Sequence, residues 1–465
     1  MAAELAASER LNYLTKKQRA VSSRHSRQII HPSNGNTFKP EQFVTIDIPG
    51  MQAATYLDFQ NSYLKIQIKN NTDKTAFIAS GYDLIEQIEL LADGNTLSSI
   101  NNYNVLVDQY MASEVGKQWK NNIGHQTVAY ANNVYGTGRP KLPTFTADDT
   151  SEVVDALSNK FTEGNNDPEA QSIANGSSLT LCLPLVLTPL FSVNKYIPLV
   201  GRSTLTLRIT FAKGARAFCY GAESSDAPTD AELIEYSPIE FIASQVRLSA
   251  EANQLVMANT RGVFELVCSD YRNSQGHIDH KKTNNVAFTT GFSFSSFDRI
   301  SFSFYPHATL NSVNLPSIRN RAKAGLKEFA LAINGEEFPK KRIDVSSTNT
   351  AEVVSELALA HRSLADFNHQ SQLPLAQYKL DTAAATAPST VGCFLAMLDL
   401  EAMQPHLGDS LYSGMTTTGA TVQLVMAFDS NSSASQGDMT CHMFANFTSA
   451  LVLDMNGSAA WQMSL

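Results

Sequence analysis

The chain has 465 residues, of which 43% are hydrophobic and only 17% are charged, and its formal net charge is −9. This length and apolar content allow large buried cores, so the composition excludes bulk disorder. There is no run of about 18 apolar residues and no leader-like segment, so we expect neither a membrane span nor a secretory signal, and therefore a reducing compartment. The cysteines are odd in number, far apart and never in a C-x-x-C pair, which argues against a disulfide framework and against a zinc site: Cys182, Cys219, Cys268, Cys393 and Cys441.

The first 40 residues differ in charge from the rest of the chain. They carry a net charge of +5, which leaves −14 for residues 41–465. Because this segment has few large apolar residues, it cannot bury enough surface to fold alone, and we expect a basic arm that can lie along a polyanion or a neighbouring subunit. A solvated tail is the alternative. The basic residues of the arm are Arg10, Lys16, Lys17, Arg19, Arg24, Arg27 and Lys39.

From residue 43 onward, apolar and polar residues alternate strictly, which is typical of strands with one buried face. Residues 179–187 contain a ladder of five alternating leucines. Residues 390–400 are apolar at both odd and even positions, as expected for a strand that is covered on both faces. The pattern indicates an all-β chain, with further alternating strands at 44–48, 64–68, 205–211, 300–304, 422–428 and 451–455.

Two stretches have helical spacing instead, and we expect each to form a short amphipathic helix against the end of a sheet. Asn349 and Glu352 give the second stretch an N-x-x-E start that resembles a capping box. The apolar residues with this spacing are Val107, Met111, Val115 and Trp119 in the first stretch, and Val353, Leu357, Ala360 and Leu364 in the second.

The chain contains an internal repeat. IEQIELLADGN (85–95) and LKEFALAINGE (326–336) superpose with Gly94 on Gly335, an offset of 241 residues. In both copies a strand ends in Asp-Gly or Asn-Gly, dipeptides that tolerate positive φ in tight turns, and a helix follows. The order of parts therefore predicts two copies of one β-unit, at residues 41–249 and 250–465, after the arm at 1–40.

No pattern that indicates catalysis or a cofactor is present. His277 and His280 lack a third zinc ligand, and the carboxylates at Asp148, Asp149 and Glu152 are more typical of a solvated turn than of a calcium site. We therefore expect no catalytic residue, no metal and no cofactor. The excursions at 120–177 and 213–235 are rich in turn-forming residues and are expected to be exposed loops.

Four segments resemble the double jelly-roll major capsid proteins of icosahedral double-stranded DNA viruses, closest to those of polinton-like viruses and virophages. They are IELLADGN followed by NNYNVLVDQYM; the leucine ladder leading through TPLFSVNKYIPL to TLTLRITF; SSFDRISFSFYP with FALAINGEEFPKKRI; and SGMTTTGATVQLVMAF. Together they span most of residues 43–455.

This resemblance implies two tandem eight-stranded antiparallel jelly rolls, with short helices in the connecting loops. It implies a structural protein of the virion, not an enzyme, in which three chains form a pseudo-hexameric capsomer that tiles an icosahedral shell around double-stranded DNA. Penton and minor capsid proteins are the implied partners. The loops at 120–177 would face outward, and the arm residues Arg10, Lys16, Lys17, Arg19, Arg24 and Arg27 would face the genome, an internal membrane or a minor protein inside the particle.

Two other classes of function compete with a shell protein. A receptor- or carbohydrate-binding β-sandwich spike should carry clustered exposed aromatic residues, but Trp119 and Trp461 are few and far apart. A β-sandwich enzyme should show histidines and carboxylates converging from inner strand positions, where this chain instead has its leucine ladder.

Overall fold

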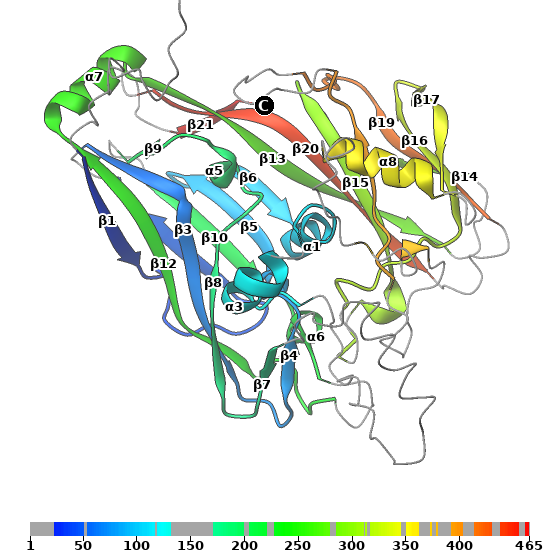
Figure 1. The fold of residues 1–465 in the computed structure, drawn as a ribbon, viewed down its shortest axis with the longest axis horizontal. Helices are drawn as coiled ribbons and strands as arrows, with labels where there is room; N and C mark the ends of the chain where they lie inside the picture. The colour runs from blue at the N-terminus through cyan, green and yellow to red at the C-terminus, as the bar shows by residue number, and fades with distance from the viewer. Residues whose placement is uncertain are drawn as a thin grey trace, which may run out of the picture.

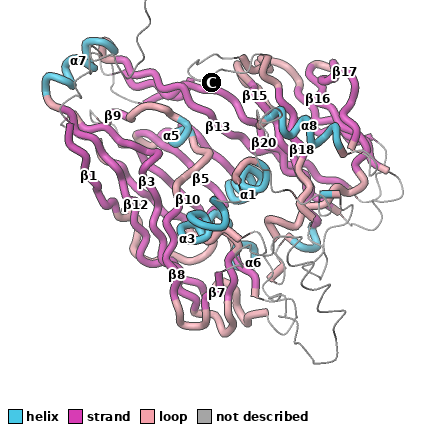
Figure 2. Tube along the Cα trace, in the orientation of Figure 1, coloured by secondary structure: helices cyan, strands magenta, loops and turns pink. Residues whose placement is uncertain are grey.

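The computed structural model describes residues 23–50, 54–116, 119–131, 171–199, 204–220, 227–279, 285–310, 312–313, 317–345, 350–361, 373, 378–379, 392–402, 413–429, 438–454 and 461–464. Two β-sandwiches lie side by side, the first drawn in blue to green and the second in green to red (Figure 1). Strands make up most of both sandwiches, and the helices lie at their ends and between them (Figure 2).

The first sandwich consists of two facing antiparallel sheets. One has the strand order β1 (Ser23–Ile30), β12 (Ile234–Leu248), β3 (Thr55–Asn70) and β8 (Ser178–Leu183), with β9 (Ile197–Pro198) beside β3. The other has the order β2 (Phe43–Ile48), β10 (Leu205–Phe211), β5 (Ile85–Ala92) and β6 (Asn95–Asn101). A small third sheet joins β11 (Phe218–Cys219), β4 (Ala76–Ile78) and β7 (Gln171–Ile173).

The second sandwich repeats this arrangement. One sheet has the order β13 (Val263–Ile278), β20 (Met439–Asp454), β15 (Phe297–Pro306) and β18 (Ala396–Asp399), with β21 (Trp461–Ser464) beside β20. The other has the order β14 (Asn285–Thr289), β19 (Val422–Phe428), β16 (Leu326–Ile333) and β17 (Glu336–Asp344).

Both sandwiches have jelly-roll topology. When the eight main strands of each sandwich are numbered in chain order, one sheet holds the first, eighth, third and sixth strands, and the other holds the second, seventh, fourth and fifth. Among the described strands, no sheet combines strands from both sandwiches. The repeat predicted from the sequence is therefore a repeat of topology.

Short helices connect the strands. Between the two sandwiches the chain forms α7 (Ala250–Thr260), whose N-cap Ser249 accepts a hydrogen bond from the backbone N–H of Ala252. None of the described helices is long and apolar enough to cross a membrane. The other helical segments are η2 (Gly81–Leu84), α1 (Tyr103–Ser113), η3 (Lys120–Gly124), α3 (His125–Val128), α5 (Pro189–Ser192), α6 (Gly214–Ala217), η5 (His307–Thr309) and α8 (Ala351–Ala360).

Alternation along the strands fills the cores as predicted. On β10, Leu205, Leu207, Ile209 and Phe211 are buried and the residues between them are half-buried. The leucine ladder is shorter than predicted, because β8 ends at Leu183, directly before Pro184, which has no N–H to offer a neighbouring strand. Leu185 is still buried, and Leu187 has a positive φ of 54°.

Both predicted helices form, but they are shorter than the spacing suggested. The first ends at Ser113, and Trp119 begins a separate π-helical turn. In the second, Thr350 is the N-cap and its side chain makes no capping hydrogen bond, so the predicted capping box is not seen. Glu352 instead accepts a hydrogen bond from the backbone N–H of Asp344, and Asn349 and Leu364 lie outside the described residues.

The N-terminal segment differs from a free arm over residues 1–40. Residues 23–30 form β1, an edge strand paired with β12 along its whole length from Ser23↔Leu248 to Ile30↔Phe241. Ordering this segment costs conformational entropy, and the polar sequence SRHSRQII buries too little apolar surface to offset that cost. The backbone hydrogen bonds to β12 offset it instead.

Candidate assembly surfaces and the seam between the jelly rolls

The two glycines singled out by the repeat lie in tight hairpin turns. Gly94 joins β5 to β6 with φ +83°, after Asp93 at +49°; Gly335 joins β16 to β17 with φ +86°, after Asn334 at +50°. Two successive residues at positive φ define the type I′ turn, whose twist matches that of the flanking strands. A Cβ at either glycine would meet no atom within 4 Å, so the backbone conformation, not crowding, favours glycine here.

The predicted arm residues lie in two places. Arg24 and Arg27 are exposed on β1, and the Arg27 guanidinium lies 5.9 Å from the centre of the Tyr63 ring on β3. Arg27 therefore lies on the outer face of the first jelly roll, whereas Arg24, three residues earlier on the same strand, points to the opposite face. The other four residues, Arg10, Lys16, Lys17 and Arg19, lie outside the described residues.

The apolar core of the first jelly roll continues into the second. Eight residues of the second jelly roll belong to the same buried cluster as the first sandwich's core: Phe264, Leu266 and Cys268 of β13, Tyr305 of β15, Ile318, and Phe444, Leu451 and Leu453 of β20. The rest of the second jelly roll has its own cluster, rich in phenylalanine. The first jelly roll is thus closed on one side by the second, along a surface that we call the seam.

A buried cluster of charges crosses the seam. Asp108 of α1 lies 3.0 Å from Nε of Arg319 and 3.2 Å from an Nη atom of Arg321, and all three side chains are buried. Arg319 also donates to the backbone carbonyls of Ala131 and Ala79, the latter at 3.1 Å. Because both arginines come from the second jelly roll and their partners from the first, these contacts fix how the two sit together.

Burial shifts several pKa values around this cluster. It raises the pKa of Asp83 to about 7, even though the nearby Arg319 favours the charged form. It raises the pKa of Asp270 to about 6, although Ser98 across the seam donates a 2.8 Å hydrogen bond to that carboxyl group. Burial, with a further contribution from Arg216, lowers the pKa of His442 to about 3, so this histidine is neutral.

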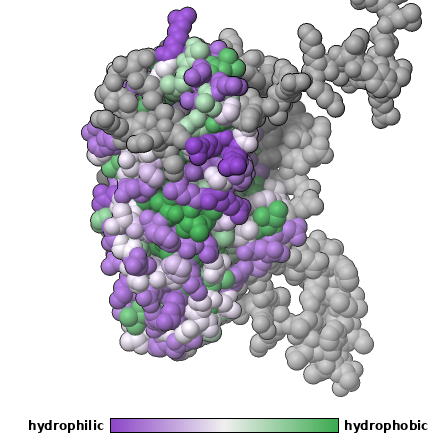
Figure 3. Space-filling model, turned by 90° about the vertical axis from the view of Figure 1, so that its left-hand side faces the viewer, coloured by the Kyte–Doolittle hydropathy of each residue, from purple (hydrophilic) through white to green (hydrophobic). Residues whose placement is uncertain are grey.

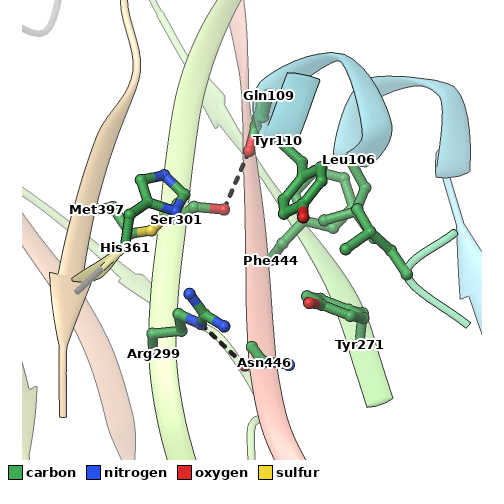
Figure 4. A pocket seen from close by; sticks show the side chains of 11 residues that line it. Leu106, Gln109, Tyr110, Tyr271, Arg299, Ser301, His361, Met397, Phe444 and Asn446 are labelled. Carbon is green, nitrogen blue, oxygen red and sulfur yellow. Dashed lines mark hydrogen bonds between the residues drawn. The ribbon is translucent and has the colours of Figure 1, made fainter. Parts of the chain in front are cut away.

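Polar side chains meet at the middle of the seam around a cavity of about 30 Å³ (Figure 4). Gln109 of α1 donates to Ser303 at 2.6 Å and accepts from Ser301 at 3.0 Å, which links α1 to β15. Arg299 donates to Asn446 at 3.0 Å on the other side of the cavity. A space of this size holds about one or two waters, so the cavity is part of the packing and not a substrate pocket.

The helix ends add a further contact across the seam. His361, directly after α8, lies 3.2 Å from a carboxylate oxygen of Glu114, directly after α1. The His361 side chain is almost fully buried. The seam is therefore lined by charged and polar groups as well as by apolar side chains, and it requires a specific fit between the two jelly rolls.

No metal site forms among the residues that the structure describes. Within these residues there is no cluster of three or more His, Cys, Asp or Glu that could hold a metal ion. His277 packs beside the ring of His307 at 5.1 Å, while His280, Asp148, Asp149 and Glu152 lie outside the described residues. The described cysteines are all free thiols.

The seam residues were not predicted from the sequence. Arg319 and Arg321 stand in the segment SIRNRAK, and Asp108 stands in an otherwise weakly charged helix, so each reads as a surface charge. The internal repeat offered one clue to the seam. If two sandwiches pack side by side, their contact covers α1 of the first sandwich and the loop after β15 of the second. Only the three-dimensional pairing shows that the charges meet.

Comparisons with known proteins find similarity at the level of structure only. No family model and no curated protein sequence matches the chain. The PBCV-1 protein VP54, fitted into a reconstruction of the virophage Sputnik, superposes with a TM-score of 0.58 at 8% identity, over 97% of this chain and 99% of that one. The chain has the double jelly-roll fold.

Two more solved structures support this assignment of the fold. The Faustovirus major capsid protein gives a TM-score of 0.54 at 9% identity, covering 95% of this chain and 93% of that one. A chain from the cryo-EM structure of the Sputnik virophage gives 0.53 at 9% identity, covering 100% of this chain and 93% of that one. The similarity extends over the whole double jelly roll and is not limited to one sandwich.

Proposed function

We propose that this chain is the major capsid protein of an icosahedral double-stranded DNA virus and that it functions in the shell of the virion. The observation that carries the proposal is the tandem repetition of one eight-stranded jelly roll across a buried, specific seam. We place the boundary between the two jelly rolls at residues 249 and 250, where α7 begins. The solved structures named as capsid proteins have the same architecture.

Three copies of such a chain bring six similar blocks around one axis. A protein with two similar flanks can close a ring of three with contacts that repeat at each step, and the six blocks then fit a hexagonal lattice. We infer a homotrimeric, pseudo-hexameric capsomer that tiles the shell, with penton and minor capsid proteins as its other partners. This function requires no catalysis.

The native mass of the purified full chain tests this proposal. A homotrimer has a mass of about 152 kDa, three times the chain mass of 50.7 kDa. Native mass spectrometry should give this mass, and negative-stain electron microscopy should show hexagonal outlines. A chain that remains monomeric at micromolar concentration would contradict the proposal.

We further propose that the part of the arm before β1 faces the inside of the particle, where it contacts DNA or a membrane without sequence specificity. Changing Arg10, Lys16, Lys17 and Arg19 together to Gln should leave trimers intact and impair closure or filling of particles. A matched control changes four lysines of the first jelly roll instead: Lys69, Lys74, Lys195 and Lys213. Normally filled particles from the arm variant would refute this role.

One observation favours a receptor- or carbohydrate-binding protein as the second candidate. A surface groove of about 450 Å³ lies between β3 and the segment after α5, and it is lined by the exposed Tyr196 and by Asn61, Asn194 and Gln60. An aromatic ring beside amide groups suits a sugar. Binding to a glycan array that is lost in Tyr196→Ala would support this candidate. If the chain binds no glycan on the array, this candidate is refuted.

A further inference from the structure

A buried histidine at the seam has an unsatisfied ring nitrogen. The side chain of His361 is only 2% exposed, and its Nδ1 lies 3.2 Å from a carboxylate oxygen of Glu114. Its Nε2 is buried and has no hydrogen-bond partner among the described residues. The ring lines the cavity of about 30 Å³ at the middle of the seam (Figure 4). Because a buried polar group without a partner costs free energy, this nitrogen points to a ligand in the cavity.

Arg299 brings a positive charge to the same cavity. Its guanidinium donates to the side-chain oxygen of Asn446 at 3.0 Å and to the backbone carbonyl of Ala360 at 2.8 Å, and both acceptors are neutral. Burial acts against the charge, but Tyr271 and several carboxylates outweigh it and raise the pKa of Arg299. Among the described residues, none of these carboxylates forms an ion pair with it. The cavity therefore contains a charge without a direct counter-ion.

Charges on the outer surface are in a different situation. The face of the molecule shown in Figure 3 is largely hydrophilic around a hydrophobic patch, and its charged side chains meet bulk water. An arginine in such a setting, like the exposed Arg27 of β1, needs no counter-ion, because water weakens the field of its charge. The space beside Arg299 holds only about one or two waters, so an anion placed there would be attracted more strongly.

The polar groups around the cavity have hydrogens to donate, while their acceptor oxygens are already used. The side-chain oxygen of Gln109 accepts from Ser301 at 3.0 Å, and that of Asn446 accepts from Arg299. The hydroxyl of Tyr271 points into the cavity (Figure 4). Burial raises the pKa of Tyr271 to about 12, although Arg299 opposes this shift, so the hydroxyl keeps its proton. A ligand that only accepts hydrogen bonds suits these groups better than water, whose own hydrogens need acceptors.

We propose that the cavity binds one monatomic anion of the size of chloride, held by Arg299, Tyr271 and His361. A His361 ring protonated on both nitrogens donates from Nδ1 to Glu114 and from Nε2 to the anion. The small volume excludes polyatomic anions such as sulfate and phosphate. Because Gln109 of the first jelly roll closes the cavity against the second, the bound anion stabilises the seam. This role does not depend on the proposed capsid function.

Thermal melts of the full chain test the proposal. Chloride replaces gluconate, which is too large for the cavity, at constant ionic strength, so the screening of surface charges does not change. A ligand that binds only the folded chain raises its melting temperature, and we expect chloride and bromide to do so until the site is saturated. A melting temperature that is the same in chloride and in gluconate would overturn the proposal.

Two tyrosine variants test whether the effect comes from this cavity. Tyr271→Phe removes one donor and keeps the ring, so the chloride concentration that gives half of the effect should rise by roughly tenfold or more. Tyr236→Phe is the matched control, because Tyr236 is buried in the core of the first jelly roll, and it should respond to chloride like the wild type. An equal response of the wild type and Tyr271→Phe would assign the effect to another site and overturn the proposal.

Bromide locates the anion directly. Crystals of the full chain grown in sodium bromide should show an anomalous peak at the bromine absorption edge, in the cavity between Arg299 and His361. A cavity that contains only water, or bromide peaks at other places only, would contradict the proposal. This measurement uses the wild-type chain, so it decides the question even if Tyr271→Phe does not fold.

Discussion

The buried ion pairs of the seam should control how stably the two jelly rolls stay together. Asp108→Asn removes one negative charge without changing the size of the side chain and leaves the guanidinium groups of Arg319 and Arg321 buried beside a neutral amide. Breaking a buried pair in this way costs about 3–5 kcal/mol, because the remaining charge has lost both its hydration and its partner. We expect the free energy of unfolding of the variant to fall by this amount.

Urea unfolding followed by fluorescence measures the effect, because Trp119 lies in the first jelly roll and Trp461 in the second. The control is Asp429→Asn, the same chemical change in an exposed pair with Lys327 at 3.8 Å, which should cost less than about 1 kcal/mol. If both variants lose less than about 1 kcal/mol, the seam charges do not hold the jelly rolls together.

Three other changes test separate parts of the structure. Gly335→Val should destabilise the chain by roughly 2 kcal/mol or more, because a β-branched residue is strained at φ +86°, while Gly335→Asn should cost clearly less; equal melting temperatures would contradict the turn argument. The pKa of Asp83 is about 7 in the folded chain and about 3.9 in the unfolded chain, so the free energy of unfolding should decrease as the pH rises between these values. In thermal melts from pH 4 to 8, the melting temperature of Asp83→Asn should decrease less with pH than that of the wild type. Leu181→Ala should cost about 2–5 kcal/mol and Leu179→Ala much less, since Leu181 is buried and Leu179 only half-buried; similar losses in urea unfolding would show that the alternation does not set the inward face.

The sequence predicted the parts of the fold that depend on local pattern. Alternation located the strands, and the match of Gly94 with Gly335 showed the tandem repeat, because a type I′ turn imposes the same dihedral angles in both copies. It did not show that β1 is an edge strand, since the polar residues of that segment carry no alternation and its order comes from pairing with β12. Strand pairing over more than 200 residues leaves no local trace.

The candidate surfaces were less predictable, for a related reason. A charge such as Asp108 or Arg321 has the same local sequence context whether it faces solvent or a second domain. Its burial follows from how two finished sandwiches meet, and the seam is built from residues distant in sequence. The sequence therefore indicated that apolar flanks must exist, and the structure was needed to locate them.

The ends of the described chain have a practical consequence. Ser23 pairs with Leu248, Val263 with Asp454, and Trp461 with Leu453, so the first described residue, the linker helix α7 and the last strand all lie at one pole of the molecule (Figure 1). A fluorescent protein or enzyme joined directly before Ser23 or directly after Ser464 should therefore emerge on the same side of an assembled layer. Peptides meant for the opposite side should instead be inserted into a connection at the far pole, such as the one between Ile278 and β14.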